Sequence, residues 1–557
     1  SAPSTTAAYM LWADTSNNLL KMRNSANDGW IDLRTLTGGI TSTADATINS
    51  VNVGKGANSV DGNTCFGESA LNDSVSGGNN TAIGKDTLTL LTSGASNTAI
   101  GSEALEDITT GSFNVAIGRQ ALKENTTADN NVAIGRMALG ANTTGDRNVA
   151  LGTTALDANT TGRRNIAVGY DSLTNNTEGE FNVAVGYKSL EDNTSADHNS
   201  AFGYQALASN TTGTNNVAIG SLSLNTSTTA SNNVAVGKDA LKLTTTGPEN
   251  TAIGDAALDA NTTGGYNTAT GRNALGSNTT ANNNAAFGHS ALGANTTGTQ
   301  NVAVGTTALD ANTTANNGAA FGHNALTDNT TGDQNTGVGA SALSKNTTAN
   351  HNTAVGAFAL SENTTGATNT ALGDNALANN TTASNNTAVG RSALQANTTG
   401  DRNTAVGEEA LTANTTGDRI TAIGVDALKA NTTVGFVTAV GFSALSANTS
   451  GTSNVAIGAL SLDANTSGSN NLAVGTSSLG ANTTGGTNTA LGIDCLDANT
   501  TASNNTGVGY NALGANTTGA SNTAVGAECL DAVTTGGDNT GVGYAAGSSL
   551  TTGSNNT

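Results

Sequence analysis

Residues 386–419 read NTAVGRSALQANTTGDR followed by NTAVGEEALTANTTGDR, two units of 17 residues that differ at only three positions. The glycine of the NTAVG segment returns at this spacing from Gly67 to Gly543, which makes 29 units without an insertion or a deletion. A period this strict means that every unit covers the same length of path. Successive coils of one stack meet that condition, so the sequence predicts a solenoid.

Several positions of the unit hardly vary along the chain. Four residues before the reference glycine stands Asn in 26 of the 29 units, and two residues before it stands Ala in all but four. The residue just before the glycine is Val, Ile, Leu or Phe in every unit except for Thr270, and the fourth residue after it is Leu in every unit but the last. The two residues that follow the glycine vary freely and carry much of the charge, so we expect them in solvated turns.

The residue types favour an extended unit. Thr, Val and Ile dominate the segment before the glycine, and no apolar face recurs at helical spacing, which predicts a short strand. The following ALxANTTG segment is predicted to be a second extended piece that ends in a turn. The fold class is therefore all-β, a parallel β-solenoid (β-roll) of 17-residue coils. At roughly 4.8 Å per coil, the repeats would form a rod about 140 Å long.

The alternation of side chains along a strand divides the residues between the inside and the outside of the coil. We expect Val406 and Leu411, and likewise Ile134 and Leu139, to fill the narrow interior. Each such burial contributes about 1.5 to 3 kcal/mol.

The opposite face of the predicted strand carries Asn403, Ala405 and Gly407. Its residues are small and uncharged in nearly every unit, a restriction that a strand facing water would not need. We therefore expect this face to be buried against another copy of the chain, which predicts a homo-oligomer, namely a homotrimeric fibre.

Two columns of asparagine, which contain Asn403 and Asn414, run along the repeats. Identical residues at one coil position stack into amide ladders whose hydrogen bonds follow the stack. Asn-Thr-Thr, as in Asn142-Thr143-Thr144, is also formally an N-glycosylation sequon. Because the repeat that makes the ladder makes the sequon automatically, we favour the ladder.

Composition excludes several classes of protein. The chain has 557 residues, but aromatics are 3%, charged residues 11% and prolines only 2, too few large side chains for several globular cores and too little charge and proline for disorder. A net charge of -21 would repel nucleic-acid phosphates and anionic lipids, so no nucleic-acid partner is expected. The sequence has no apolar run of about 18 residues, so no membrane insertion is expected.

Three segments are expected along the chain. Residues 1–50 do not repeat, contain both tryptophans and are predicted to form a small β module of two or three strands for attachment or capping. Residues 51–62 lead into the solenoid, which covers residues 63–557 and closes on an incomplete unit. We expect a cap or a tip to follow that unit.

No cofactor, metal or catalytic site is expected. Cys495 and Cys529 lie two units apart, about 10 Å in a stack, so they are predicted to be buried thiols without a disulfide. His289 and His323 are equally far apart, too far to share one metal ion. No nucleophile with its base and no phosphate-binding loop stands out, so the chain is not expected to be an enzyme.

The segments NVAIG (131–135) and NVAVG (182–186), each followed by xxALxA or a close variant, resemble the head repeats of trimeric autotransporter adhesins. In those heads each of three chains winds a left-handed β-roll, whereas the units of this chain are longer by the NTTG segment. The repeats are also similar to regions of bacteriophage tail-fibre-like proteins, and residues 10–33 resemble short modules near the attachment end of such fibres. The sequence contains neither a coiled-coil stalk nor a membrane-anchor barrel, which favours the phage fibre.

The expected function is therefore the shaft of a virion appendage that presents a host-adhesion tip, with residues 1–50 docked to a virion attachment protein. The alternatives are a bacterial surface adhesin or extracellular filament subunit, and an ice- or surface-binding repeat protein. Host-surface glycan or protein is a further expected partner. Tyr170, Tyr187 and Tyr204, which follow the reference glycine in three successive units, are candidate glycan contacts, although solvated turn tyrosines are the commoner case.

Overall fold

The computed structural model describes residues 11–14, 16, 19–23, 30–35, 46–48, 50–73 and 75–557. The chain divides into two compact units, residues 1–212 and residues 213–557, and each is described by itself. Both are built from strands and turns, and the described residues contain no α-helix. No helix among them could span a membrane.

The first unit contains two antiparallel elements and the beginning of the repeats. Strands β1, β2 and β3 form an antiparallel sheet in that order, where sequence analysis expects two or three short strands. Strand β5 pairs antiparallel with both β4 and β6, and from β6 onward the pairing is parallel. The strands are β1 Leu11–Asp14, β2 Leu19–Arg23, β3 Trp30–Thr35, β4 Ala46–Ile48, β5 Val51–Gly54, β6 Thr64–Gly67, β7 Thr81–Ile83, β8 Thr98–Ile100, β9 Val115–Ile117, β10 Val132–Ile134, β11 Val149–Leu151, β12 Ile166–Val168, β13 Val183–Val185 and β14 Ser200–Phe202, with a short 3-10 turn at Ala57–Ser59.

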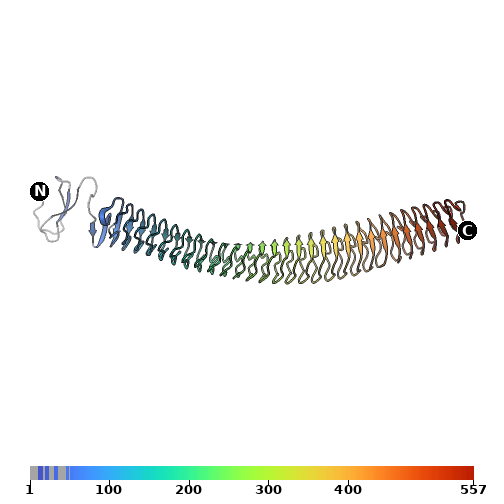
Figure 1. The fold of residues 1–557 in the computed structure, drawn as a ribbon, viewed down its shortest axis with the longest axis horizontal. Coiled ribbons are helices and arrows are strands. Elements are labelled where there is room, and N and C mark those ends of the chain that lie inside the picture. Colours follow the sequence, from blue (N-terminus) through green and yellow to red (C-terminus); the bar gives the residue numbers. More distant parts are fainter. Residues whose placement is uncertain are drawn as a thin grey trace. The chain divides into compact units, whose positions relative to one another are not determined.

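The second unit consists of repeats alone. Its strands pair in parallel with the neighbouring coil, residue i beside residue i+17, as in Ala388, Ala405 and Ala422. Figure 1 shows the strands of successive coils side by side, with the turns along the other edge of each coil. The strands are β15 Val217–Ile219, β16 Val234–Val236, β17 Thr251–Ile253, β18 Thr268–Thr270, β19 Ala285–Phe287, β20 Val302–Val304, β21 Ala319–Phe321, β22 Thr336–Val338, β23 Thr353–Val355, β24 Thr370–Leu372, β25 Thr387–Val389, β26 Thr404–Val406, β27 Thr421–Ile423, β28 Thr438–Val440, β29 Val455–Ile457, β30 Leu472–Val474, β31 Thr489–Leu491, β32 Thr506–Val508, β33 Thr523–Val525 and β34 Thr540–Val542.

The all-β parallel solenoid of 17-residue coils is therefore confirmed. The expectation of two strands per coil is wrong, because each coil has one strand and the ALxANTTG segment is a series of turns. Between one strand and the next, three residues other than glycine adopt the left-handed conformation in a typical coil, for example Glu409, Leu411 and Arg419 with φ of 56°, 55° and 57°. A backbone with this alternation cannot continue a strand.

The turn side of the coil is nevertheless hydrogen-bonded to its neighbours. The backbone N–H of Leu411 donates to the carbonyl of Ala427 at 2.8 Å, and that of Thr415 donates to the carbonyl of Thr432 at 2.7 Å. Backbone groups on both sides of the coil thus find their partners one coil away, which satisfies the requirement that buried polar groups be paired.

The strand faces the interior with its middle residue. Ala405 is fully buried, whereas Thr404 and Val406 on either side of it are partly exposed. The prediction that Val406 and Ile134 fill the interior is wrong, since both lie on the outside of the coil, while Leu411 and Leu139 are fully buried as expected. The interior is narrow, because the strand contributes alanine and only the turn side contributes a large side chain.

Candidate functional site

The asparagine ladders lie inside the coil. Asn403 donates its backbone N–H to Oδ1 of Asn386 at 2.8 Å and its Nδ2 to the carbonyl of Gly417 at 2.8 Å. Its own Oδ1 accepts the N–H of Ile420 in the next coil at 2.9 Å. The amide thus bonds to the coils on both sides, and the predicted ladder is confirmed for this column.

The second column behaves in the same way. Asn414 Nδ2 donates to Oδ1 of Asn397 at 3.0 Å and to the carbonyl of Gly417 at 3.1 Å. Asn142, within its sequon, is fully buried, and its Nδ2 donates to the carbonyl of Gly145 at 2.9 Å. The folded coil therefore closes this amide nitrogen to a glycosyltransferase.

The predicted contact face between chains turns out to be internal. Asn403 and Ala405 are fully buried within their own coil. A Cβ added at Gly407, where φ is 137°, would lie 2.4 Å from the carbonyl oxygen of Gly424, so the close approach there is to the next coil of the same chain. These residues are small because the coil has little room for them, and their size carries no argument for a partner.

The opposite side of each strand points away from the coil interior and forms a surface of the molecule. We call the outer face the side chains of the first and third residues of strands β6–β34, such as Thr404 and Val406. None of these residues is charged in any strand. Many of the large ones are well exposed, with Phe66 at 55%, Leu372 at 47% and Leu491 at 46%.

The sequence contains a signal for this assignment. The middle position of the strand holds only Ala, Cys or Gly, as in Cys65 and Gly337. The outer positions hold uncharged residues of every size from Ala to Phe. A column limited in size rather than in polarity is typical of a narrow interior. Sequence analysis attributed the same restriction to a partner chain.

The three candidate tyrosines lie together in the first unit. Tyr170, Tyr187 and Tyr204 are 50%, 43% and 51% exposed, and their rings stack with centroids 5.6 Å and 5.5 Å apart. Because neighbouring rings face one another, the middle ring presents its edge and its hydroxyl to a ligand rather than its face.

A second stack flanks the same strands on their other side. The guanidinium of Arg164 lies 5.1 Å from the ring centroid of Phe181, and that ring stacks on His198 at 4.9 Å. Phe202 on the outer face is also exposed. Sequence analysis missed this aromatic patch, although the clustering of aromatics in an aromatic-poor chain would have indicated it.

Within the repeats, from β6 to β34, the charged side chains stand in the turns and not in the strands. Arg391 pairs with Glu408 of the next coil, and Lys429 pairs with Asp426 at 3.0 Å. Burial raises the pKa of the carboxyls of Asp463 and Asp497, which lie on either side of Gly480. Among the described residues, no group of three His, Cys, Asp or Glu side chains is placed to hold a metal ion.

Cys495 and Cys529 are buried thiols without a disulfide, as predicted. Burial raises the pKa of Cys495 to about 12, so its thiolate is not populated at neutral pH. A Cβ on Gly507 would lie 2.5 Å from Sγ of Cys495, and one on Gly541 would lie 2.8 Å from Sγ of Cys529. Each of these cysteines therefore occupies space that a glycine in the next coil leaves free.

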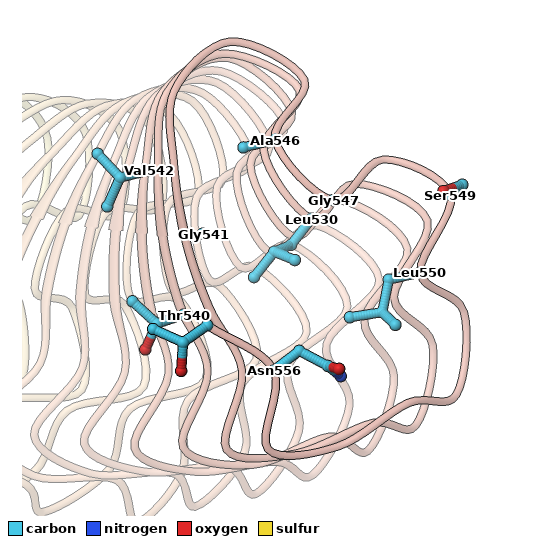
Figure 2. A pocket seen from close by; sticks show the side chains of 10 residues that line it. Leu530, Thr540, Gly541, Val542, Ala546, Gly547, Ser549, Leu550 and Asn556 are labelled. Carbon is cyan, nitrogen blue, oxygen red and sulfur yellow. The ribbon is translucent and has the colours of Figure 1, made fainter.

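The hollow at the last coil belongs to the packing of the coils. Leu530, Gly541, Ala546 and Leu550 are among the residues that line it. Figure 2 shows Leu530 and Leu550 within the coil and Val542 on its outside. Because the same positions line the interior of the preceding coils, the hollow is the coil interior seen from one side and not a separate ligand site.

No protein-family model, no curated protein and no solved structure matches this chain.

Proposed function

We propose that this chain is a structural fibre protein, the shaft of a virion appendage such as a phage tail or head fibre, which holds a host-adhesion tip away from the particle. In this proposal residues 1–50 attach to the virion. The alternative location is the surface of a bacterium, as an adhesin or an extracellular filament subunit. No catalytic role and no cofactor are part of the proposal.

The observation that carries the proposal is the bonding between coils. In the second unit, 20 strands follow one another in parallel register, β15 to β34, with backbone bonds on the turn side as well. At about 4.8 Å per coil, this unit alone extends on the order of 90 Å. A stack held by backbone bonds on both sides resists bending, which is the property that a spacer needs.

Electron microscopy of the purified full-length chain tests the mechanical part of the proposal. We expect straight or gently curved particles of uniform width, whereas compact or strongly flexible particles would contradict it. Immunogold labelling with an antibody against the repeats then distinguishes the two locations, by decorating either virions or bacterial cells.

A second candidate function, binding to ice or to another ordered surface, is favoured by the threonines at the first position of β24 to β28. These residues form a regular uncharged column on the outer face. Thermal hysteresis of the purified chain is the direct test, and its absence would remove this candidate.

Host glycan binding is a third candidate, favoured by the exposed ladder of Tyr170, Tyr187 and Tyr204. The phenol hydroxyls would supply hydrogen bonds to sugar hydroxyls. A glycan array probed with the intact chain and with the triple Tyr→Phe variant tests this role, because loss of only the hydroxyls should abolish a specific signal.

A further inference from the structure

The outer face of the second unit is the uncovered face of a parallel sheet. Parallel sheets are found almost only where both faces are covered. In this chain the inner face is covered by the leucines of the turn side, such as Leu411 and Leu428, which are fully buried. No residue of this unit covers the outer face in the same way, since its large apolar side chains are exposed, among them Ile253, Phe287, Phe321 and Ile457.

The outer face of this unit is exposed but carries no charged side chain. The chain carries 41 acidic and 20 basic residues, and many of them stand in the turns that border the strands, as do Arg391 and Glu408. Yet no strand from β15 to β34 has a charged residue at its first or third position. Packing within the coil does not demand this, because these side chains point away from the interior.

The sizes of the outer side chains are also balanced. From β7 to β34, Phe occupies the third position in three strands, at Phe202, Phe287 and Phe321. The first position of these same three strands holds Ser200, Ala285 and Ala319, and in that range no other strand has so small a residue there. In these three strands the largest outer side chain thus stands beside a small one on the same face. Water does not require such a match, but a packed interface favours it.

We propose that the outer face of β15–β34 packs against the same face of a second copy of this chain. The occupant must present an uncharged surface that repeats at the spacing of the coils, and another copy does so along its whole length. Strands of about 10 Å spaced by about 4.8 Å give the 20-strand face an area on the order of 900 Å², compared with about 800 Å² per partner in a standard interface. The copies then meet along a neutral strip, which keeps their net negative charges apart.

The proposed interface rests on the proposed fibre function and names the partner of the fibre, a second copy of the chain. Its contact surface is the outer face, in place of the internal residues that the sequence predicted. The first measurement is the mass of the full-length chain by light scattering after size exclusion. A multiple of 54.6 kDa supports the interface, and a particle of 54.6 kDa overturns it. Particle shape, which tests the fibre role, is measured separately, so that either idea can fail alone.

A charge scan locates the interface. The triple variant Val389→Glu, Val406→Glu and Ile423→Glu places three carboxylates on the outer face of adjacent coils, all partly exposed in the single chain. Burying them without partners should raise the dissociation constant at least about 100-fold.

The matched control for that variant is Thr399→Glu, Thr416→Glu and Thr433→Glu, which adds the same charge to the same coils at exposed turn positions. It should leave the mass unchanged. Equal dissociation of the two variants would overturn the proposed face, and unchanged circular dichroism confirms that both are folded.

A size test separates packing between copies from packing within the chain. Ala319→Val beside Phe321 should weaken association about tenfold by overfilling the interface, whereas Thr336→Val beside Val338 should change it little. If Ala319→Val lowers thermal stability but leaves the dissociation constant unchanged, the balance of sizes belongs to the single chain and the argument from volume fails.

Discussion

Each coil has a strand side and a turn side, and both must satisfy their backbone hydrogen bonds and fill the interior. The strand side, for example Thr404–Val406, uses extended backbone, small inner residues and an uncharged outer face. The turn side uses left-handed residues such as Glu409 and Leu411, supplies the large core side chain and carries the charges. Both bond to the neighbouring coils. Regular bonding between coils therefore does not require strands, and the exclusion of charge from the strand side needs a separate cause.

The largest expected effect concerns the core that the turn side supplies. Leu411→Ala should lower the free energy of local opening by about 2 to 5 kcal/mol, because Leu411 is fully buried. Val406→Ala in the same coil should cost less than about 1.5 kcal/mol in the dissociated chain, since Val406 lies on the outer face. Hydrogen exchange of amides in β26 and β27 measures both, and equal effects would contradict the assignment of inside and outside.

The two sides of the coil meet in the interior at Cys495, on the turn side, and Gly507, in a strand. Substitutions at these two residues test whether the two sides compete for space there. Gly507→Ala should cost about 1 to 3 kcal/mol, because the new Cβ would lie 2.5 Å from Sγ of Cys495. The double variant with Cys495→Ala restores the Ala–Ala contact of most coils and should recover most of that loss. Purely additive effects in a double-mutant cycle followed by thermal unfolding would show that the two residues do not compete for space.

The backbone of the turn side provides a smaller test. Ala256 has φ of 53°, so Ala256→Gly should raise local stability by about 1 kcal/mol by relieving left-handed strain. Ala260, in the same turn region, is not among the positive-φ residues, and Ala260→Gly should lower stability by about 0.5 to 1 kcal/mol. Opposite signs in hydrogen exchange support this difference, and the same sign for both contradicts it.

The smallest expected effect is a dependence on pH at the turns. Burial, and then the charge of Asp494, raise the pKa of Asp497, so the native state binds its proton more tightly than the unfolded chain does. Stability is therefore present below the ordinary Asp pKa and is lost as the pH rises through the raised pKa. Asp497→Asn should stabilise the chain at pH 7 and have little effect at pH 3. A stabilisation that is the same at both pH values would contradict this account.

The sequence predicts the coil better than it predicts the orientation of its residues. The period, the strand before each glycine, the buried leucine and the asparagine ladders all follow from columns of identical residues, as at Leu411 and Asn403. The orientation of the three-residue strand does not, because apolar side chains occupy both of its faces. Only the restriction of the Ala405 position to small residues indicates which face is internal. That restriction has two physical explanations, a narrow interior or the close approach of a partner chain.

The turn side was mispredicted for another reason. Leucine is seldom found in the left-handed region, so a segment such as Ala410-Leu411 gives no local indication of that conformation. Bonds to the neighbouring coils, such as that from Leu411 to Ala427, impose it. Propensities that treat one segment at a time do not contain this information. The aromatic stacks likewise depend on residues that are 17 positions apart.

The change from antiparallel to parallel pairing at β6 has a consequence for how the first unit folds. The β4–β5 hairpin pairs residues only a few positions apart, so it closes a short loop and forms rapidly. Strand β5 then offers β6 a ready edge, and each later strand adds to the one before it after closing a loop of the same 17 residues. The hairpin therefore acts as a template for the repeats of this unit. The repeats add to it one after another from the N-terminus, which is also the order in which the ribosome synthesises them.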